Sequence, residues 1–302
     1  MEKRDIAGLL EKEGPLTGAE LVERTRMEVF SLWIACKCSP SVHFETIGTR
    51  FLRLDRAVHG YARLSPSIRR EFLTYTLVGL KSQAEVLTRK AESLRDDIRR
   101  ISGAKLDLAR ASVASALDSL PGKDDFLSKI CFIIAGDITY EMSHLVPRPE
   151  KSTGELVRGS DLDIIVVADN DLPAEEVRQI DRAIYRKKHY LLVHPDYREE
   201  IDYILKNLDR VKEQLLFDTF ESMVACKILN EGKYLHGSQG LFQAIKTLVA
   251  EHGIPERLRE MELQAIASRE QAEARLLELG GELSEAEALH LFYTKEEGEE
   301  IY

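Results

Sequence analysis

The spacing of apolar residues changes several times along the chain, and each change predicts a different structural element. Over residues 4–38 the apolar positions recur at helical spacing, and the pattern is interrupted at Gly14-Pro15 and again at Ser39-Pro40. This predicts three short helices, because proline cannot continue a helix and restricts the residue before it. From residue 42 to 55 apolar and polar residues alternate around Gly48, which predicts a short β-hairpin.

Three short helices followed by a hairpin resemble a winged helix-turn-helix domain, which we expect over residues 1–60. The resemblance makes residues 29–38 the recognition helix and residues 48–53 the tip of the wing. It assigns contacts with nucleic-acid phosphates to three basic residues, Lys37, Arg50 and Arg53. The segment contains 9 Lys and Arg residues against 9 Asp and Glu residues. Since nucleic-acid-binding domains are usually basic, a winged helix that contacts another protein is the alternative.

Residues 61–121 are predicted to form mainly a long amphipathic helix that links the winged-helix segment to the rest of the chain. Apolar residues recur there every seven positions, at Leu80, Leu87, Leu94 and Ile101. A seam of this kind is typical of coiled coils. It can join two copies of the protein into a homodimer or pack against the protein's own domains, and both alternatives are open.

After residue 121 the chain changes character, because strand and loop patterns replace the long helices. Apolar runs at 129–137 and 161–169 predict two buried strands joined by a polar loop, and residues 174–190 have the pattern of a helix. Strand, loop, strand and helix predict a unit built around a sheet over residues 122–240. The expected fold class is therefore α+β, with several domains.

Two aspartates, Asp161 and Asp163, stand at the start of the second of these strands. Side chains alternate along a strand, so both carboxylates project from the same face, with their Cα atoms ~6.5–7 Å apart. Like charges at this distance repel each other, and a shared cation is the simplest way to keep both ionised. Oxygen ligands suit Mg²⁺ or Mn²⁺, and Mg²⁺ keeps open positions for phosphate groups. The spacing therefore suggests a site for a metal-nucleotide complex.

The residues 159-GSDLDIIV-166, preceded by a strand that ends at Gly136, resemble the nucleotidyltransferase superfamily that includes DNA polymerase β. The resemblance covers about residues 126–240. It implies a mixed sheet with flanking helices and the Mg²⁺-dependent transfer of a nucleoside monophosphate from an NTP to a hydroxyl group. It makes Gly136 the turn glycine beside the phosphates, and Asp161 and Asp163 the catalytic metal ligands. The residues expected to contact the nucleotide are Gly136, Asp137, Ser160, Arg158 and Lys187.

A third catalytic carboxylate is expected on a later strand, and Asp202 is the candidate. Residues 200-EIDYIL-205 have the hydrophobic-Asp-hydrophobic order that the superfamily places there. The apolar residues around Asp202 also fit helical spacing. In that case residues 190–194 form the third strand and Asp202 is a solvated helix residue. Both interpretations of this segment are open.

The net charge of −10 is concentrated at the C-terminal end of the chain. Residues 251–302 contain 5 Lys and Arg against 14 Asp and Glu, which leaves a nearly balanced charge on the rest. We expect residues 241–302 to form helices and an acidic tail, and the balance elsewhere is compatible with an anionic partner. No apolar run approaches the ~20 residues needed to cross a bilayer, so we expect a cytoplasmic protein without a membrane partner.

Three functional interpretations are compatible with these patterns. The leading one is a Mg²⁺-dependent nucleotidyltransferase that a winged-helix domain directs to a hydroxyl acceptor on RNA, a protein or a small molecule. The alternative is a non-catalytic winged-helix regulator whose nucleotidyltransferase-like domain senses a nucleotide or only mediates contacts. Asp137 favours the alternative, because the superfamily has Gly-Ser or Gly-Gly at the turn and an aspartate repels a triphosphate. The third gives Asp161 and Asp163 a purely structural role at the start of a strand.

Overall fold

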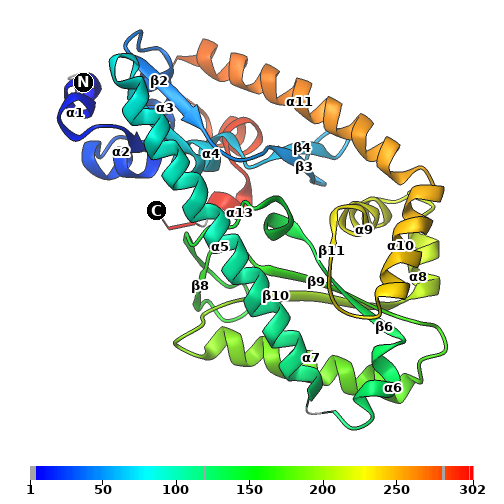
Figure 1. The fold of residues 1–302 in the computed structure, drawn as a ribbon. Helices are drawn as coiled ribbons and strands as arrows, with labels where there is room; N and C mark the ends of the chain where they lie inside the picture. The colour runs from blue at the N-terminus through cyan, green and yellow to red at the C-terminus, as the bar shows by residue number, and fades with distance from the viewer. Residues whose placement is uncertain (1–4, 119, 281–282, 299, 302) are drawn as a thin grey trace. The chain divides into compact units, whose positions relative to one another are not determined.

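A computed structural model describes residues 5–118, 120–280, 283–298 and 300–301 as a mixed α and β fold (Figure 1). The chain forms two compact units. The first unit contains the residues up to Ile98 together with Met261–Glu300, and the second contains Arg99–Glu260 with Ile301. These units do not follow the four segments expected from the sequence, because the long helix is divided at residues 98 and 99 and the C-terminal segment at residues 260 and 261. Among the described residues no helix combines the length and the apolarity needed to cross a bilayer.

The first unit is built from short helices around a three-stranded antiparallel sheet of order β1-β5-β2. Its N-terminal elements are α1 (Ile6–Glu13), β1 (Leu16–Thr17), α2 (Gly18–Thr25), α3 (Val29–Lys37), β2 (Val42–Thr46), β3 (Phe51–Leu54), β4 (Ala62–Ser65), α4 (Ile68–Tyr75) and β5 (Thr76–Leu80). Its C-terminal elements are the later part of α11 (Ile254–Leu279), α12 (Glu285–Glu287), a π-helical turn (Ala288–Phe292) and α13 (Lys295–Gly298). Both groups contribute apolar side chains to one core cluster.

The three predicted short helices are confirmed, but the predicted hairpin over residues 42–55 is wrong. β2 pairs with β5 along its whole length, from Val42 opposite Leu80 to Thr46 opposite Thr76, whereas β3 pairs with β4. The error arises at β5, which the apolar pattern assigned to a helix. All five residues of β5 are buried, and a continuous apolar run does not distinguish a strand from a helix.

The long amphipathic helix is confirmed as α5 (Ala84–Asp118), which follows a 3-10 turn at Lys81–Gln83. Of the predicted seam, Leu87 is buried, with 1% of its surface exposed, whereas Leu94 and Ile101 are half-buried. Leu80, the first residue of the predicted seam, belongs to β5 instead. Leu87 therefore packs within the chain, and a homodimer formed through the seam stays a prediction.

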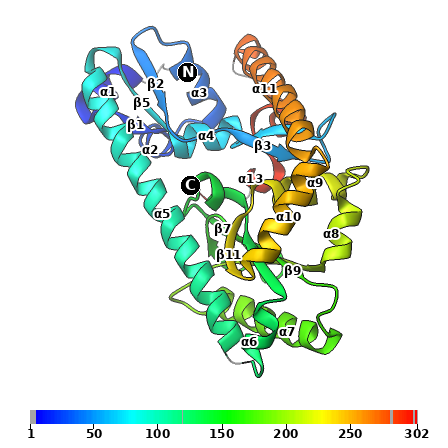
Figure 2. The ribbon, with the colours of Figure 1, turned by 45° about the vertical axis from the view of Figure 1, so that its right-hand side comes forward.

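The second unit is organised around a mixed sheet of order β10-β9-β6-β11, in which β9 and β10 are parallel and the other neighbours are antiparallel. Its elements after α5 are α6 (Lys123–Leu127), β6 (Ile130–Ile134), a 3-10 turn (Gly136–Tyr140), β7 (Pro147–Pro149), β8 (Leu156–Arg158), β9 (Leu162–Ala168), α7 (Ala174–Val193), β10 (Ile201–Asn207), α8 (Leu208–Gln214), α9 (Phe220–Glu231), β11 (Lys233–Gly237) and α10 (Gln239–Glu251). In both views α7 lies below β9 and α9 lies above it, while α10 runs beside β11 (Figures 1 and 2). The even-numbered residues of β6 and β9 share a core cluster with residues of α5 and α7.

The strand interpretation of residues 200–205 is confirmed, because they lead into and form β10. The alternative, a strand at residues 190–194, is wrong, since α7 continues to Val193. Ile201, Tyr203 and Leu205 contribute to the core that contains α7, which is the alternation of a strand. Asp202 therefore points away from that core.

Buried ion pairs hold the acidic C-terminal segment against the N-terminal elements of the first unit. Glu297 is 1% exposed and Glu300 is 6% exposed, and both pair with Arg70, whose Nη1 lies 3.5 Å from Glu297 Oε1. Burial opposes the ionisation of Glu297, but the positive charges of Arg70 and Arg63 outweigh it and lower its pKa to about 2. The negative charge at this end of the chain is therefore used inside the fold.

We expect the substitution Glu297→Gln to destabilise the first unit at neutral pH. The ordinary pKa of this carboxyl is 4.5 and the folded value is about 2, so the stabilisation is present above pH 4.5 and is lost as the pH falls towards 2. The free energy of unfolding at pH 7 should fall by about 3 kcal/mol, the scale for breaking a buried ion pair. Urea denaturation at a series of pH values measures this difference, which should disappear near pH 2.

The control is Glu285→Gln, which changes an exposed glutamate of the same segment and should leave stability unchanged. Equal unfolding free energies for the two variants at pH 7 would show that the buried pair contributes nothing.

Candidate functional site

Two carboxylates lie on one face of the sheet at the point where β9 begins. Asp161 precedes the strand, Asp163 is its second residue, and both are half-buried. Leu162 and Ile164 are fully buried in the core that contains α7. Because side chains alternate along a strand, the burial of these two residues fixes both aspartates on the opposite face.

Strand β10 brings two more carboxylates to the same face. The register of the parallel pair sets Asp202 beside Asp163. One position earlier, the Leu162 N–H donates to the carbonyl of Glu200 at 2.9 Å, which sets Glu200 beside Asp161. Register neighbours in a sheet project to the same face. We call Asp161, Asp163, Glu200 and Asp202 the carboxylate cluster.

Sequence reasoning identified three members of the carboxylate cluster and missed Glu200. A signal was present, because Glu200 and Asp202 have the same i, i+2 spacing as Asp161 and Asp163. Two such pairs on neighbouring strands form a two-by-two arrangement, which only the pairing of the strands reveals.

The turn after β6 lies against this cluster, and its first residue, at position 136, has to be a glycine. Gly136 has a φ of +69°, in the left-handed region that side chains disfavour. A Cβ atom at this position would overlap the carboxylate of Asp163. The Ala135 N–H also donates to the Asp163 carbonyl at 2.9 Å. Gly136 and Asp163, both predicted site residues, are therefore brought into direct contact.

Asp137 and Ser160, two predicted nucleotide contacts, bind each other. The Ser160 hydroxyl donates to Asp137 Oδ2 at 2.7 Å and accepts from the His144 N–H at 3.2 Å. The pair ties the turn after β6 to the segment that enters β9. In this conformation the carboxylate of Asp137 is held by the hydroxyl group of Ser160.

The backbone N–H of the turn donates a hydrogen bond to a carboxylate that was not predicted from the sequence. Glu231, at the end of α9, accepts from the Gly136 N–H at 3.4 Å and from the Tyr140 hydroxyl at 2.6 Å. Lys227, one helical turn earlier, lies 2.5 Å from the same carboxylate. Glu231 is thus a protein anion at a backbone amide of the kind that can cradle a phosphate.

Arg148 neutralises one side of the carboxylate cluster. Its Nη2 donates to Asp161 Oδ1 and, at 2.9 Å, to Glu200 Oε2. The guanidinium is largely buried, with 17% of the side chain exposed. Arg148 belongs to β7, in the long loop between β6 and β9, and the prolines on either side of it favour extended backbone there. The residue pattern Pro-Arg-Pro was the only sequence signal for this contact.

The carboxylate cluster has the donor chemistry of a Mg²⁺ site, because carboxylate oxygens are the ligands that Mg²⁺ prefers. Its present arrangement does not fit a bound ion. Within the described part of the chain, no three acidic, His or Cys side chains are close enough to share a metal. Asp161 and Glu200 are turned to Arg148, which already supplies a positive charge there.

The two basic residues predicted for the nucleotide, Arg158 and Lys187, have no contact with the cluster among the described interactions. Lys187 belongs to α7, whose apolar side packs on the opposite face of the sheet, and its ammonium donates to Ser115 at 2.9 Å. Arg158 is exposed at the end of β8, and its carbonyl accepts from Lys105 at 2.8 Å. Lys105, which the sequence analysis did not single out, also forms a buried pair with Glu199 at 2.6 Å and so anchors the segment that enters β10.

The three basic residues predicted to contact nucleic acid face acidic groups of their own unit. Arg50 forms a two-point hydrogen bond with Glu71 at 2.6 and 2.7 Å and also contacts Glu273. Lys37 lies 4.0 Å from Glu273 and over the ring of Phe44. The partners of Arg50 in this structure are thus acidic residues of α4 and α11.

Arg53, the third of these residues, is half-buried on β3, where its charge contributes to the low pKa of Glu297. The predicted recognition helix, α3, is also partly covered. Phe30 and Trp33 of α3 pack edge-on against Phe292 of the C-terminal segment, at ring separations of 5.3 and 5.9 Å.

We expect Gly136→Ala to cost more stability than the matched substitution Gly154→Ala. Both glycines have a positive φ, +69° and +72°, so both variants carry the backbone cost of about 1 kcal/mol. Only at Gly136 does the new methyl group meet a carboxylate, whereas nothing lies within 4 Å of it at Gly154. Chemical denaturation should show at least about twice the loss for Gly136→Ala. Similar losses would mean that the turn does not pack on Asp163.

Comparisons of the chain with protein-family models, with curated proteins and with solved structures found no match. The function of the carboxylate cluster has to follow from its own residues.

Proposed function

We propose that the second unit is a nucleotidyltransferase, which moves a nucleoside monophosphate from a Mg²⁺-bound NTP to a hydroxyl group of an acceptor. The observation that carries this proposal is the register of β9 and β10, which sets Asp202 beside Asp163. The resemblance of residues 159–166 to the superfamily requires a third carboxylate on a later strand. The sequence left this residue open between a strand and a helix, and it lies on the neighbouring strand.

The charge of the cluster also supports the proposal. Four carboxylates lie on one face of two adjacent strands, and Arg148 pairs with two of them. Like charges at neighbouring positions repel, and a cation held by Asp163 and Asp202 would reduce this repulsion. A Mg²⁺ ion bound there would supply positive charge beside the triphosphate, which is the chemistry that the proposed transfer needs.

The residues of the chain have separate tasks in this proposal. Asp163 and Asp202 provide oxygen ligands, and Gly136 gives the nucleotide close access to the backbone beside Asp163. The first unit brings the acceptor, which is a nucleic acid or a protein partner if the winged-helix resemblance holds. The N-terminal basic residues would then have to exchange their present carboxylate partners for the phosphates of that acceptor.

A nucleotide sensor without catalytic activity is the second candidate, and specific contacts favour it. Asp137 is bound by Ser160, and Glu231 occupies the amide of Gly136, where the superfamily leaves room for a phosphate. A domain with these contacts can bind a nucleotide weakly or in a changed position and lack turnover. The two candidates differ in whether labelled nucleotide becomes covalently attached to an acceptor.

Incubation with labelled NTPs and Mg²⁺ tests the proposal. We expect transfer to RNA, to protein or to a small-molecule acceptor, and a loss of about 100-fold or more in Asp163→Asn and in Asp202→Asn, the scale for removing one group that stabilises the transition state. Asp196→Asn is the control, since Asp196 is 85% exposed outside the site, and it should retain full activity. Nucleotide binding without transfer supports the sensor, and the absence of both contradicts both candidates.

Arg148→Gln should strengthen the binding of a divalent cation in the absence of any nucleotide. Removal of the guanidinium leaves Asp161 and Glu200 without their counter-ion, so the affinity for Mn²⁺ should rise by about tenfold. Electron paramagnetic resonance of free Mn²⁺ measures this affinity directly. Arg178→Gln removes an exposed arginine of α7 and should leave the affinity unchanged. An unchanged affinity in Arg148→Gln would exclude competition between the arginine and the metal.

A further inference from the structure

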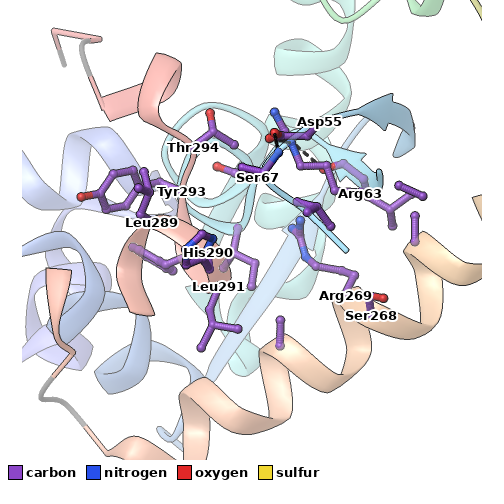
Figure 3. Close-up of a pocket in the computed structure, with 18 of the residues that line it drawn as sticks. Asp55, Arg63, Ser67, Ser268, Arg269, Leu289, His290, Leu291, Tyr293 and Thr294 are labelled. Carbon is purple, nitrogen blue, oxygen red and sulfur yellow. Dashed lines mark hydrogen bonds and ion pairs between the residues drawn. The ribbon is translucent and has the colours of Figure 1, made fainter. Parts of the chain in front are cut away.

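A cavity of about 310 Å³ lies within the first unit. Its wall consists of the end of β3 with the turn that follows, β4 with the start of α4, one side of α11, and residues 289–295. Figure 3 shows these side chains, with Ser268 and Arg269 projecting from α11 and Leu289 to Thr294 coming from the C-terminal segment. The volume falls within the ~300–1,000 Å³ of small-molecule sites. The cavity shares no residue with the carboxylate cluster, which belongs to the second unit.

Arg63, in β4, is a buried cation in this wall with spare hydrogen-bonding capacity. Its Nε donates to Asp55 at 2.9 Å and its Nη1 contacts the Leu64 carbonyl at 3.5 Å. Only 14% of the side chain is exposed, and within the described residues its Nη2 donates no hydrogen bond. An arginine has five N–H donors, so this side chain can bind a further acceptor without losing Asp55.

Arg269, in α11, contributes a second buried guanidinium. Its Nε donates to Glu273 at 3.0 Å and its Nη1 to the Pro66 carbonyl at 2.9 Å. Its buried Nη2 lies 3.3 Å from Glu71 but has no hydrogen-bond partner in the described part of the chain. Two cations with unused donors therefore line the same cavity.

The charge balance around the cavity favours an added anion. Burial, and next the positive charge of Arg53, lower the pKa of Arg63, while Glu297 and Asp55 oppose this shift. Among the described lining residues, Asp55 is the only carboxylate, against Arg63, Arg269 and Lys295, although Glu71 and Glu273 behind the wall pair with Arg269. A negative group bound at Arg63 would offset the unfavourable positive charge of Arg53 there.

Most of the remaining wall is apolar, which sets the second requirement for an occupant. Its larger apolar side chains are Val58, Leu64, Ile68, Leu289, Leu291 and Phe292. We infer that this cavity binds a small organic anion, with its apolar body against these side chains and one acidic group, a carboxylate or a phosphate, at Arg63 and Arg269. This inference does not depend on the proposed nucleotidyl transfer.

One residue of the C-terminal segment, Phe292, connects the cavity to the N-terminal helix α3. Phe292 lines the cavity and packs edge-on against Trp33 of α3, at 5.9 Å between ring centroids. Trp33 is the single tryptophan of the chain. Occupation of the cavity constrains Phe292, so it should change the fluorescence of Trp33. The same contact provides a route by which the ligand can influence α3.

The full-length protein is titrated with 3-phenylpropanoate, with phenyl phosphate and with the neutral 3-phenylpropanamide, and binding is followed by calorimetry and by Trp33 fluorescence. We expect at least one of the two anions to bind saturably and to change the fluorescence, and the amide to bind about tenfold more weakly or not at all. Comparison of the two anions shows which acidic group is preferred. Absence of saturable binding by either anion, or equal binding of the amide, overturns the inference.

Two variants and one control localise the binding. Arg63→Gln should weaken anion binding by about tenfold, and Ser268→Phe should block it by filling the cavity while both arginines remain. Arg275→Gln changes an arginine of α11 whose side chain is 57% exposed, and it should bind the anion as the wild type does. If Arg63→Gln fails to fold, Ser268→Phe decides the matter, because unchanged binding in that variant places the anion elsewhere.

Discussion

The parallel pairing of β9 with β10 is the constraint on which the candidate site depends. Both strands bury one row of apolar side chains against the core that contains α7, so their other row has to face the opposite side. A shift of the register by one residue would send the carboxylates of β10 into that core, where unpaired charge is costly. The apolar row therefore holds Asp163 and Asp202 side by side although they are 39 positions apart in the sequence.

Each unit contains a group of charged side chains that lie close together, and the balance of charge within the group differs between the two units. In the first unit Arg70, Glu297 and Glu300 are buried together. Two acidic residues of the C-terminal segment therefore help to hold that segment in place. In the second unit Arg148 pairs with Asp161 and Glu200 of the carboxylate cluster, where four carboxylates lie on one face of the sheet. Buried ion pairs hold a segment in place, whereas a group of like charges is where a partner of opposite charge can bind.

The sequence predicts the elements whose signals are local. The helix starts and stops of α1 to α3 and the buried runs of β6 and β9 follow from capping residues, prolines and continuous apolar segments. Strand β5 was missed because a fully buried strand and a buried helix share the same apolar pattern. The hairpin prediction failed for the same reason, since β2 pairs with the strand that the pattern concealed.

The residues of the candidate site also differ in whether a local sequence signal reveals them. Asp161, Asp163 and Gly136 could be found because they stand in a short motif, and Asp202 because it follows a recognisable order of residue types. Glu200, Glu231 and Arg148 act through contacts that span 13 to 95 positions, and nothing local in the sequence specifies those partners. Long-range pairing is set by the packing of whole strands and helices, which the apolar pattern predicts only in part.

We propose that a metal-nucleotide complex binds at the carboxylate cluster. Paramagnetic broadening of amide resonances by Mn²⁺, in the presence of an NTP analogue that cannot be hydrolysed, locates the metal directly. We expect the broadening to be strongest at Gly136, Asp163 and Asp202 and to be abolished in Asp163→Asn. Broadening centred on the acidic segment at residues 285–300, or unchanged broadening in that variant, would contradict it.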